Sequence, residues 1–376
     1  MTRAARPGGS SPTPRSVDVA RLAGVSQKTV SRVLNDEPYV SAEVKQRVLD
    51  AAEQLGYRLN NAARALASGR TRSIGVVTLG TALYGPVSLL MGIERAVRGT
   101  GYALRVVNTM EGDPGGIDSA VESLLEQGVD GIVISEPIDE GAAPIRVDVP
   151  VLVLGAPPTF AAARVVTAGV GSDLLARVAT EHLLDLGHPT VHHLAGPQRW
   201  YSARDRLEGW RAALLARGLS RPPVVEGDWS AASGYVAGRE LAEDGDVTAV
   251  FAANDDMAIG LIRALLEAGR RVPDDVSVVG FDDIPVAAYV TPPLTTARQP
   301  FDAVAAEGLH LLVHAIEKPH LDPPPSAEQS IELVVRASTA PPPPRTTPGR
   351  PRRAIPRTRS GPHGPPVSNG GSPIQQ

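Results

Sequence analysis

The chain has 376 residues, 42% of them hydrophobic, and contains no cysteine. This length can bury a sizeable core in more than one domain, while the lack of cysteine excludes disulfides and thiolate metal sites. No stretch approaches the roughly 20 apolar residues that span a bilayer, and residues 1–16 lack the apolar core of a secretory signal. We therefore expect a cytoplasmic protein.

The charge is unevenly distributed along the chain. Residues 1–72 hold 12 Lys and Arg against 6 Asp and Glu, and residues 341–376 hold 6 Arg and no acid, so that each end carries +6. Since the net charge is −4, residues 73–340 carry −16. A basic head on an acidic body is typical of a nucleic-acid-binding region attached to another domain, although a charge run alone is usually a solvated face.

The two ends of the chain have the composition of disordered tails. Residues 1–14 are mostly Arg, Pro, Gly and Ser, and residues 341–376 are rich in Pro and Arg, so neither segment can bury a core. We expect a disordered basic tail at each end. For the second, an inert solvated tail is favoured over weak non-specific contact with DNA.

Residues 15–59 are patterned as three short helices with a very small shared core. Gly24 provides a tight turn after the first helix, and Ser26 can cap the second through its hydroxyl group. The third helix is predicted to begin at Ser41 and to end at Gly56. The predicted apolar faces contain Val19, Ala20, Ala23, Val25, Val30, Val33, Leu34, Val44, Val48, Leu49, Ala52 and Leu55.

Three helices of this kind are typical of a helix-turn-helix domain, in which the second helix enters the major groove of DNA. Gln27 and Lys28 lead that helix, and Arg32 lies about one turn further along. A Gln side chain can hydrogen-bond the edge of adenine, whereas Lys and Arg can hydrogen-bond the edge of guanine. The expected DNA contacts are Ser26, Gln27, Lys28, Thr29, Ser31, Arg32 and Asn35. On spacing alone, a helical hairpin with a polar surface is an equal alternative.

Residues 60–72 are predicted to form a hinge helix. The stretch NNAARALASGR (60–70) is about two turns of good helix formers, and a helix that short is marginal in water. Two such helices from a dimer could fold in the minor groove, with Leu66 wedged between base steps. The alternative is a simple linker.

From Ser73 onward, β-rich apolar runs alternate with helical stretches, which is the pattern of a parallel α/β sheet. Gly128, Gly187, Gly218 and Gly269 directly follow helical stretches, where a left-handed cap favours glycine. The predicted strands are 73–79, 102–108, 129–135, 149–154, 190–195, 248–253 and 275–281. The predicted helices are 116–127, 172–186, 203–217, 232–243 and 255–268.

The motifs in this order resemble the LacI (lactose repressor) family of transcriptional regulators. The resemblance covers roughly residues 15–337, and the core is closest to the sugar-responsive type. It lies in DVARLAGVSQKTVSRVLN (18–35), VSAEVKQRVLDAAEQLGY (40–57), NNAARALASGRTRSIGVV (60–77), SARDRLEGW (202–210), EGDWSA (226–231), ANDDMAIG (253–260), DVSVVGFDDIP (275–285) and PPLTTARQPF (292–301).

The resemblance implies a small all-α helix-turn-helix head, joined by the hinge helix to an α/β core of two parallel-sheet subdomains like those of periplasmic binding proteins. The core spans 73–340. The near subdomain is expected at 73–164 and 293–320, and the distal one at 165–292 and 321–340, with a final strand near 329–336. Because the end of the chain has no leucine heptads, we expect a homodimer without a tetramerisation helix, bound to a pseudo-palindromic operator.

The family also implies an effector site in the cleft between the subdomains, at the carboxyl ends of strands. Charged and amide side chains can engage two sugar hydroxyls at once, and an indole can stack on the C–H face of the ring. On their own, Arg206 suggests only a surface salt bridge and Trp229 only core packing. The expected effector contacts are Arg206, Asn254, Asp282 and Trp229, then Ser202, Gln299 and Phe301, with Leu83 and Pro86 on the near side.

Two departures from the type member of the family bear on the ligand. Gly155 stands where that protein has an acidic residue, and Leu79 stands where it has a serine. These changes argue against a β-galactoside, so that another sugar or glycoside is favoured as the inducer of a sugar-operon repressor. A purine acting as co-repressor is the alternative.

Two further classes of function are disfavoured. An enzyme could use Asp255, Asp256, Asp282 and Asp283, or the pair His192 and His193, but no catalytic motif is present, and adjacent histidines in a strand point to opposite faces. We expect no catalytic residues, no metal and no cofactor. A sugar-binding protein without a DNA role is disfavoured by the head and by the missing signal peptide.

Overall fold

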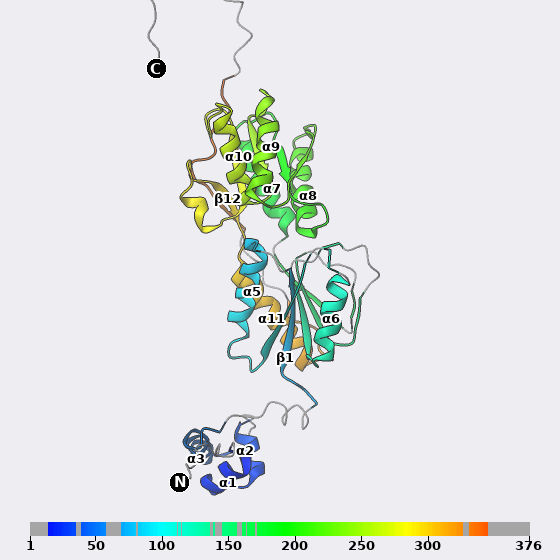
Figure 1. Cartoon of the computed structure of the whole chain (residues 1–376), viewed down its shortest axis with the longest axis vertical. Coiled ribbons are helices and arrows are strands. Elements are labelled where there is room, and N and C mark those ends of the chain that lie inside the picture. The colour runs from blue at the N-terminus through cyan, green and yellow to red at the C-terminus, as the bar shows by residue number, and fades with distance from the viewer. Residues whose placement is uncertain are drawn as a thin grey trace, which may run out of the picture. The chain divides into compact units, whose positions relative to one another are not determined.

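A computed structural model of the chain supports this organisation (Figure 1). It describes residues 14–34, 39–57, 69–79, 82–110, 112–113, 115–135, 138–139, 145–155, 160–162, 164–169, 171–325 and 331–344. The expected tails at 1–14 and 341–376 and the hinge helix therefore lie almost entirely outside the described residues.

The head is a three-helix unit formed by α1 (Ser16–Ala23), α2 (Gln27–Leu34) and α3 (Ala42–Gln54). As predicted, Gly24 makes the turn after α1 in a left-handed conformation, with φ of 66°. The hydroxyl oxygen of Ser26 accepts a hydrogen bond of 3.1 Å from the Thr29 amide, which caps the second helix. Ser41 caps α3 in the same way through the Val44 amide. The predicted caps and turn are therefore confirmed.

The buried centre of the head consists of valine and alanine, with Leu34, Leu55 and Tyr57 packed partly buried against it. Its fully buried members are Val19, Ala20, Ala23, Val30, Val33, Val48, Ala51 and Ala52. Leu49, which was expected on the apolar face of the third helix, is 41% exposed. The helical rotation turns Leu49 away from the seam, and Ala51 takes the buried position instead.

The near subdomain is built on a parallel sheet in the order β2-β1-β3-β5-β7. Helices α5 (Tyr84–Val97) and α11 (Phe301–Glu317) cover one face, and α6 (Gly116–Glu126) covers the other (Figure 1). The strands are β1 (Ser73–Leu79), β2 (Ala103–Thr109), β3 (Gly131–Ser135), β5 (Val151–Leu154) and β7 (Val165–Ala168). Beside this sheet, β4 (Ile145–Val147) pairs with β6 (Phe160–Ala162).

The distal subdomain is built on a second sheet in the order β13-β12-β11-β10-β8-β9, parallel except for β13. Helices α7 (Ser172–Asp185) and α8 (Tyr201–Ala216) cover one face, and α9 (Ala231–Glu243) and α10 (Asp255–Glu267) cover the other. The strands are β8 (His192–Ala195), β9 (Val225–Glu226), β10 (Ala249–Ala252), β11 (Ser277–Asp282), β12 (Thr295–Arg298) and β13 (Glu332–Val334), and a short 3-10 helix, η1, spans Pro285–Ala288.

All seven predicted strands and all five predicted core helices are present, with ends within two residues of the prediction. The four glycines predicted to follow helices all have positive φ, between 66° and 96°. Two helices that border the near sheet, α5 and α11, were not predicted.

The expected boundaries between the subdomains are wrong by one strand at two crossings. β7 was assigned to the distal subdomain but pairs with β5 in the near sheet. β12 was assigned to the near subdomain but pairs with β11 in the distal sheet. Each of these strands lies immediately before a crossing, so that its sequence pattern cannot show which sheet it completes.

The end of the core is fastened by buried polar groups. The hydroxyl of Ser338 donates to the Val278 carbonyl at 2.6 Å and accepts from the Thr295 amide at 2.8 Å. The His188 imidazole lies 2.9 Å from the Ala340 carbonyl. These contacts anchor the segment that contains β13, the final strand expected near 329–336.

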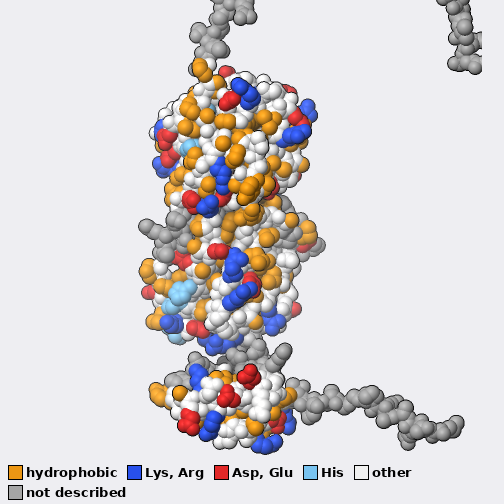
Figure 2. Space-filling model, turned by 90° about the vertical axis from the view of Figure 1, so that its left-hand side faces the viewer, with side chains coloured by type: hydrophobic (Ala, Val, Ile, Leu, Met, Phe, Trp, Pro, Cys, Tyr) orange, Lys and Arg blue, Asp and Glu red, His pale blue; other side chains and the backbone are white. Residues whose placement is uncertain are grey.

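Side chains of both charges are spread over the surface. On the face drawn in Figure 2, acidic and basic groups lie between separate hydrophobic side chains over the core. None of the helices in the described part of the chain has the length and apolar character that crossing a bilayer requires.

Glycine allows α9 and α10 to pack very closely, which gives a test of the distal core. A Cβ on Gly260 of α10 would overlap the Ala231 carbonyl and lie 2.7 Å from the Tyr235 nitrogen. We expect Gly260→Ala to lower the free energy of unfolding, measured by urea titration, by about 1–3 kcal/mol through overpacking. Helix propensity alone would raise it by about 1 kcal/mol.

Gly245→Ala is the matched control, because nothing lies within 4 Å of a Cβ at that position. Its effect should stay within about 0.5 kcal/mol. A stabilised Gly260→Ala protein would contradict the close packing of these helices.

Candidate functional site

The predicted DNA-reading residues lie on the second helix of the head. Ser26, Gln27, Lys28, Ser31 and Arg32 are exposed, and Thr29 is half-buried. The Gln27 amide donates a 2.7 Å hydrogen bond to the hydroxyl of Ser16 at the start of α1. This contact fixes the side chain at the leading edge of α2. Asn35 and Leu66, the other two predicted contacts, lie outside the described residues.

A cavity in the core brings together most of the predicted effector residues. The space between the atoms there is about 310 Å³, a figure that includes open solvent at its mouth. Seven of the nine predicted contacts line it, and its full lining is Leu83, Tyr84, Gly85, Pro86, Trp200, Ser202, Arg206, Trp229, Asn254 and Asp282.

The polar side chains of the cavity follow the carboxyl ends of three neighbouring strands of the distal sheet. Ser202 and Arg206 belong to α8, which comes after β8. Asn254 directly follows β10 as the N-cap of α10, and Asp282 is the last residue of β11. Because parallel strands end at one edge of a sheet, residues far apart in the sequence meet here.

Arg206 and Asp282 form a buried pair of opposite charges. The guanidinium Nη2 lies 3.7 Å from the Asp282 carboxylate, and both side chains are less than 10% exposed. Nη1 donates to the Ala253 carbonyl at 2.6 Å. The guanidinium also lies 4.0 Å from the centre of the Phe281 ring and 5.2 Å from that of Trp229, which places it between two aromatic groups.

Burial raises the pKa of Asp282 to about 6, although the Arg206 charge and a hydrogen bond from Gln299 both lower it. The Gln299 amide donates to this carboxylate at 2.8 Å. Desolvation disfavours the ionised form of Asp282, whereas hydrogen bonds to the carboxylate favour it. Additional hydrogen-bond donors in the cavity would therefore lower the pKa of Asp282.

Trp229 is held in place by its neighbours. The Asn254 amide donates to the Trp229 carbonyl at 2.9 Å, while its oxygen accepts from the Met257 amide as the cap of α10. The indole packs on the backbone of Gly196, where a Cβ would lie 2.5 Å from Cζ3 of the ring. Asn254 and Gly196 therefore position the indole in the cavity wall.

The backbone is strained at the same place. Trp229 has a backbone φ of 75°, Asp282 of 108° and Asp283 of 54°. Residues other than glycine rarely adopt such positive φ values. Strained residues of this kind concentrate at binding sites, where the surroundings enforce the conformation. Here the strain fixes the direction of an indole and of a carboxylate.

Two buried N–H donors in the cavity lining lack a hydrogen-bond partner among the described residues: Nε of Arg206 and Nε1 of Trp229. Buried donors without partners are rare in folded proteins. An acceptor atom placed beside either donor would complete its hydrogen bonds.

The two remaining predicted contacts, Gln299 and Phe301, do not line the cavity. Gln299 hydrogen-bonds Asp282, and the Phe301 ring packs against Tyr84 with 5.8 Å between ring centres. Both therefore act on residues of the wall. Sequence reasoning missed Tyr84, Gly85 and Trp200, although Trp200, an indole two residues before Ser202, was a signal.

The carboxylates considered for an enzyme have structural partners. Asp255 accepts hydrogen bonds from the Thr296 hydroxyl at 2.6 Å and from the Ile284 amide at 2.9 Å. Asp283 pairs with Arg298 and Arg336, both at 2.6 Å. These contacts join the loop after β11 to β12 and to the segment after β13.

The two adjacent histidines are not grouped with other metal-binding side chains in the described part of the chain. His193 is buried against Phe251 and Trp210, and burial lowers its pKa to about 4. Within the described ranges, no three His, Asp or Glu side chains are grouped closely enough to hold a metal ion.

Two segments of the chain match known protein families. Residues 17–60 match the family described as bacterial regulatory proteins, lacI family, and residues 180–339 match the periplasmic binding protein-like domain. The first segment contains the three helices of the head, and the second contains most of the cavity residues.

The chain is also similar to repressors over most of its length. It is 37% identical over 317 residues to the ribose operon repressor of Escherichia coli (strain K12), covering 81% of this chain and 93% of that protein. It is 31% identical over 328 residues to the repressor PurR of Photobacterium profundum, covering 85% and 97%.

The chain is also similar in structure to solved regulators over most of its length. A Lac repressor dimer bound to operator and the anti-inducer ONPF matches with a TM-score of 0.71 and 33% identity, covering 86% of this chain and 98% of that one. The complex of the regulator CelR with cellobiose matches with a TM-score of 0.63 and 32% identity, covering 86% and 99%.

The contact between Gly196 and Trp229 can be tested by a double-mutant cycle. We expect Gly196→Ala to lower the free energy of unfolding by about 1–3 kcal/mol, because the new methyl group displaces the indole. In a Trp229→Ala background the same change should cost less than about 0.5 kcal/mol. Equal costs in the two backgrounds, measured by urea titration, would show that the ring is not what Gly196 accommodates.

Proposed function

Because the chain belongs to the LacI family of bacterial regulatory proteins, we propose that it is a repressor that binds a pseudo-palindromic operator as a homodimer and is released by a sugar or glycoside. Proteins of this family are DNA-binding regulators and not enzymes. A protein that acts on an operator works in the cytoplasm, which is where we place this one.

We assign DNA reading to the exposed face of α2. Gln27 and Lys28 at its leading end and Arg32 one turn on carry the side chains that pair with adenine and guanine edges. Ser26 and Thr29 suit phosphate contacts at the helix N-terminus. We keep Ser31, Asn35 and the Leu66 wedge as parts of the same proposal.

The observation that carries the sugar proposal is the set of buried polar side chains that line one cavity. Asp282 can accept hydrogen bonds, and Arg206 and Trp229 each have a donor with no partner in the part of the chain that the structure describes. Asn254 and Ser202 line the same cavity. A sugar hydroxyl both donates and accepts, so that adjacent hydroxyls can satisfy this set. The apolar near side and the indoles suit the C–H faces of the ring.

A purine co-repressor is the alternative, since a purine repressor is among the relatives. The indoles of Trp200 and Trp229 meet at 77°, so that they cannot sandwich a flat base between parallel faces. A puckered ring with hydroxyls on its edge fits this corner better. The geometry therefore favours a sugar.

We propose that the ligand acts through the relation between the two subdomains. Residues of both subdomains line the cavity. The predicted hinge, residues 60–72, directly precedes the first strand of the near subdomain. A ligand that prefers one arrangement shifts the population toward it. Converting nearly full occupancy of the operator to nearly full release requires a difference in binding of about 5.5 kcal/mol between the two states.

The proposal is tested by two measurements on the full chain. Thermal unfolding is followed with D-ribose, lactose, cellobiose and hypoxanthine, and mobility shifts on the DNA upstream of its own gene are repeated with each compound that raises the Tm. We expect a sugar to raise the Tm and to release the DNA. Stabilisation by hypoxanthine with tighter DNA binding would support the purine alternative, and no preference for that DNA over random duplex would refute the proposal.

The pKa of Asp282 predicts how sugar affinity depends on pH. If only the ionised carboxylate accepts sugar hydroxyls, affinity is fully present above pH 7 and is lost as the pH falls through about 6. Calorimetric titration should show an approximately tenfold weaker Kd at pH 5 than at pH 7.5.

Asp282→Asn is the matched control because it keeps the size of the side chain but cannot ionise. It should bind the sugar weakly, with little change between the two pH values. A pH dependence that survives in this variant would assign it to another group, of which the buried Asp255 is the nearest candidate.

A further inference from the structure

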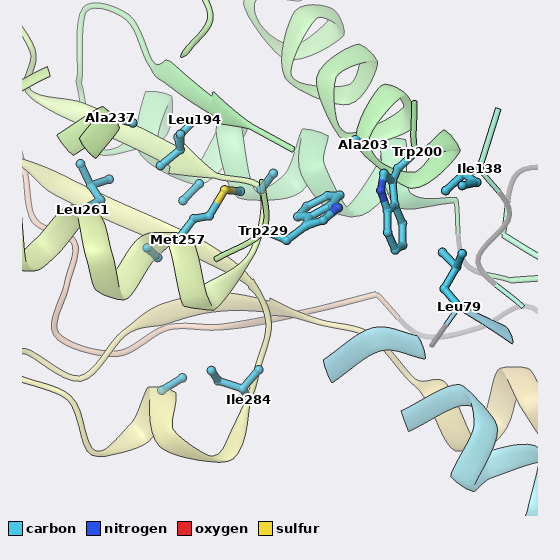
Figure 3. Packing of buried hydrophobic residues seen from close by; sticks show 14 of the residues in the cluster. Leu79, Ile138, Leu194, Trp200, Ala203, Trp229, Ala237, Met257, Leu261 and Ile284 are labelled. Carbon is cyan, nitrogen blue, oxygen red and sulfur yellow. The ribbon is translucent and has the colours of Figure 1, made fainter. Parts of the chain in front are cut away.

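Trp200 stands at the junction of the two subdomains. It is the N-cap residue of α8 and is only 4% exposed. It lines the cavity and also belongs to the hydrophobic cluster that contains Leu79 and Ile138 of the near subdomain. Figure 3 shows its indole between Trp229 on one side and Ile138 and Leu79 on the other.

The backbone at Trp200 is joined across the cleft. Ile138 and Trp200 form an isolated antiparallel β-bridge, and the Asp139 amide donates to the Arg199 carbonyl at 2.7 Å. The Arg204 guanidinium adds an ion pair with Asp139 at 2.9 Å. The short segment after β3 is therefore fastened to the segment that begins α8.

The side chain of Trp200 is joined to the ligand-binding groups. Its ring meets that of Trp229 edge to face, with 5.8 Å between the ring centres. Trp229 in turn lies beside the Arg206 guanidinium. A ligand that contacts Trp229 and Arg206 in this cavity lies next to the indole of Trp200, which lines the same cavity.

We infer that Trp200 is the side chain through which occupancy of the cavity alters the contact between the subdomains. This inference rests on the proposed function and adds to it the residue that connects the cavity to the contact between the subdomains. Its indole is a wall of the cavity, and its backbone is one half of the cross-cleft bridge. A shift of the indole therefore acts directly on Ile138 and Asp139. Arg206, Asn254 and Asp282, by contrast, belong to the distal subdomain.

The contact can be tested first without ligand, through hydrogen exchange of the Asp139 amide in the full chain. Trp200→Leu keeps an apolar side chain but loses the indole. We expect this amide to exchange at least tenfold faster in the variant, while amides of α10 keep their protection. Arg204→Ala removes a partly exposed ion pair, the hydrogen bond from Arg204 to the Gln198 carbonyl and the contact with the Tyr201 ring. Because these contacts lie at the surface, we expect the substitution to change the rate by less than about threefold.

Trp210→Phe is the control on the same helix, because Trp210 is fully buried against His193 and does not line the cavity. It should leave exchange at Asp139 unchanged. If Trp200→Leu does not fold, Trp200→Phe should give a smaller increase in the same direction. An unchanged Asp139 amide in a folded Trp200 variant would overturn the inference, whether or not any sugar binds.

The coupling is tested by adding whichever of D-ribose, lactose and cellobiose binds the wild-type protein. We expect that sugar to change the exchange of the Asp139 amide at least fivefold in the wild type and less than twofold in Trp200→Leu, at concentrations that saturate each. Equal responses in the two proteins would refute the link. If no sugar binds the wild type, the proposed function fails, and the comparison without ligand still decides the role of Trp200 at the cleft.

Discussion

A guanidinium and a carboxylate that share a buried cavity are the constraint around which the core is arranged. Removing Arg206 and Asp282 from water is costly, and their mutual attraction offsets this only when other groups complete their hydrogen bonds. The Ala253 carbonyl and Gln299 supply part of that completion. The pair is thus poorly satisfied by the protein alone, which suits a site that must gain from its ligand.

Keeping such a pair in place requires support from groups that a ligand need not touch. Asp255 ties the loop after β11 to β12 through Ile284 and Thr296. Burial raises the pKa of this carboxyl well above its usual range, and the nearby charge of Asp282 raises it further. The positive φ of Asp282 is kept beside these contacts, and the bond from Asn254 to the Trp229 carbonyl holds the backbone of Trp229.

The head and the core differ sharply in the amount of apolar surface that they bury. All fully buried side chains of the head are valine or alanine, whereas the core contains Trp210, Phe251 and Phe281. Small units with small cores are only marginally stable. We therefore expect the head to be less stable than the core.

The local sequence pattern alone determined the helices, strands and turns, because these depend on residues that are neighbours in the chain. The seven strands, five helices, the cap at Ser26 and the turn at Gly24 follow from hydrophobic period and turn chemistry, and the motif order indicated the cavity residues Arg206, Asn254 and Asp282. Tertiary structure decided which sheet β7 and β12 complete, that Gln299 and Phe301 lie behind the cavity wall, and that Trp200 joins the subdomains. These features depend on contacts between separate segments of the chain, and no local period records such contacts.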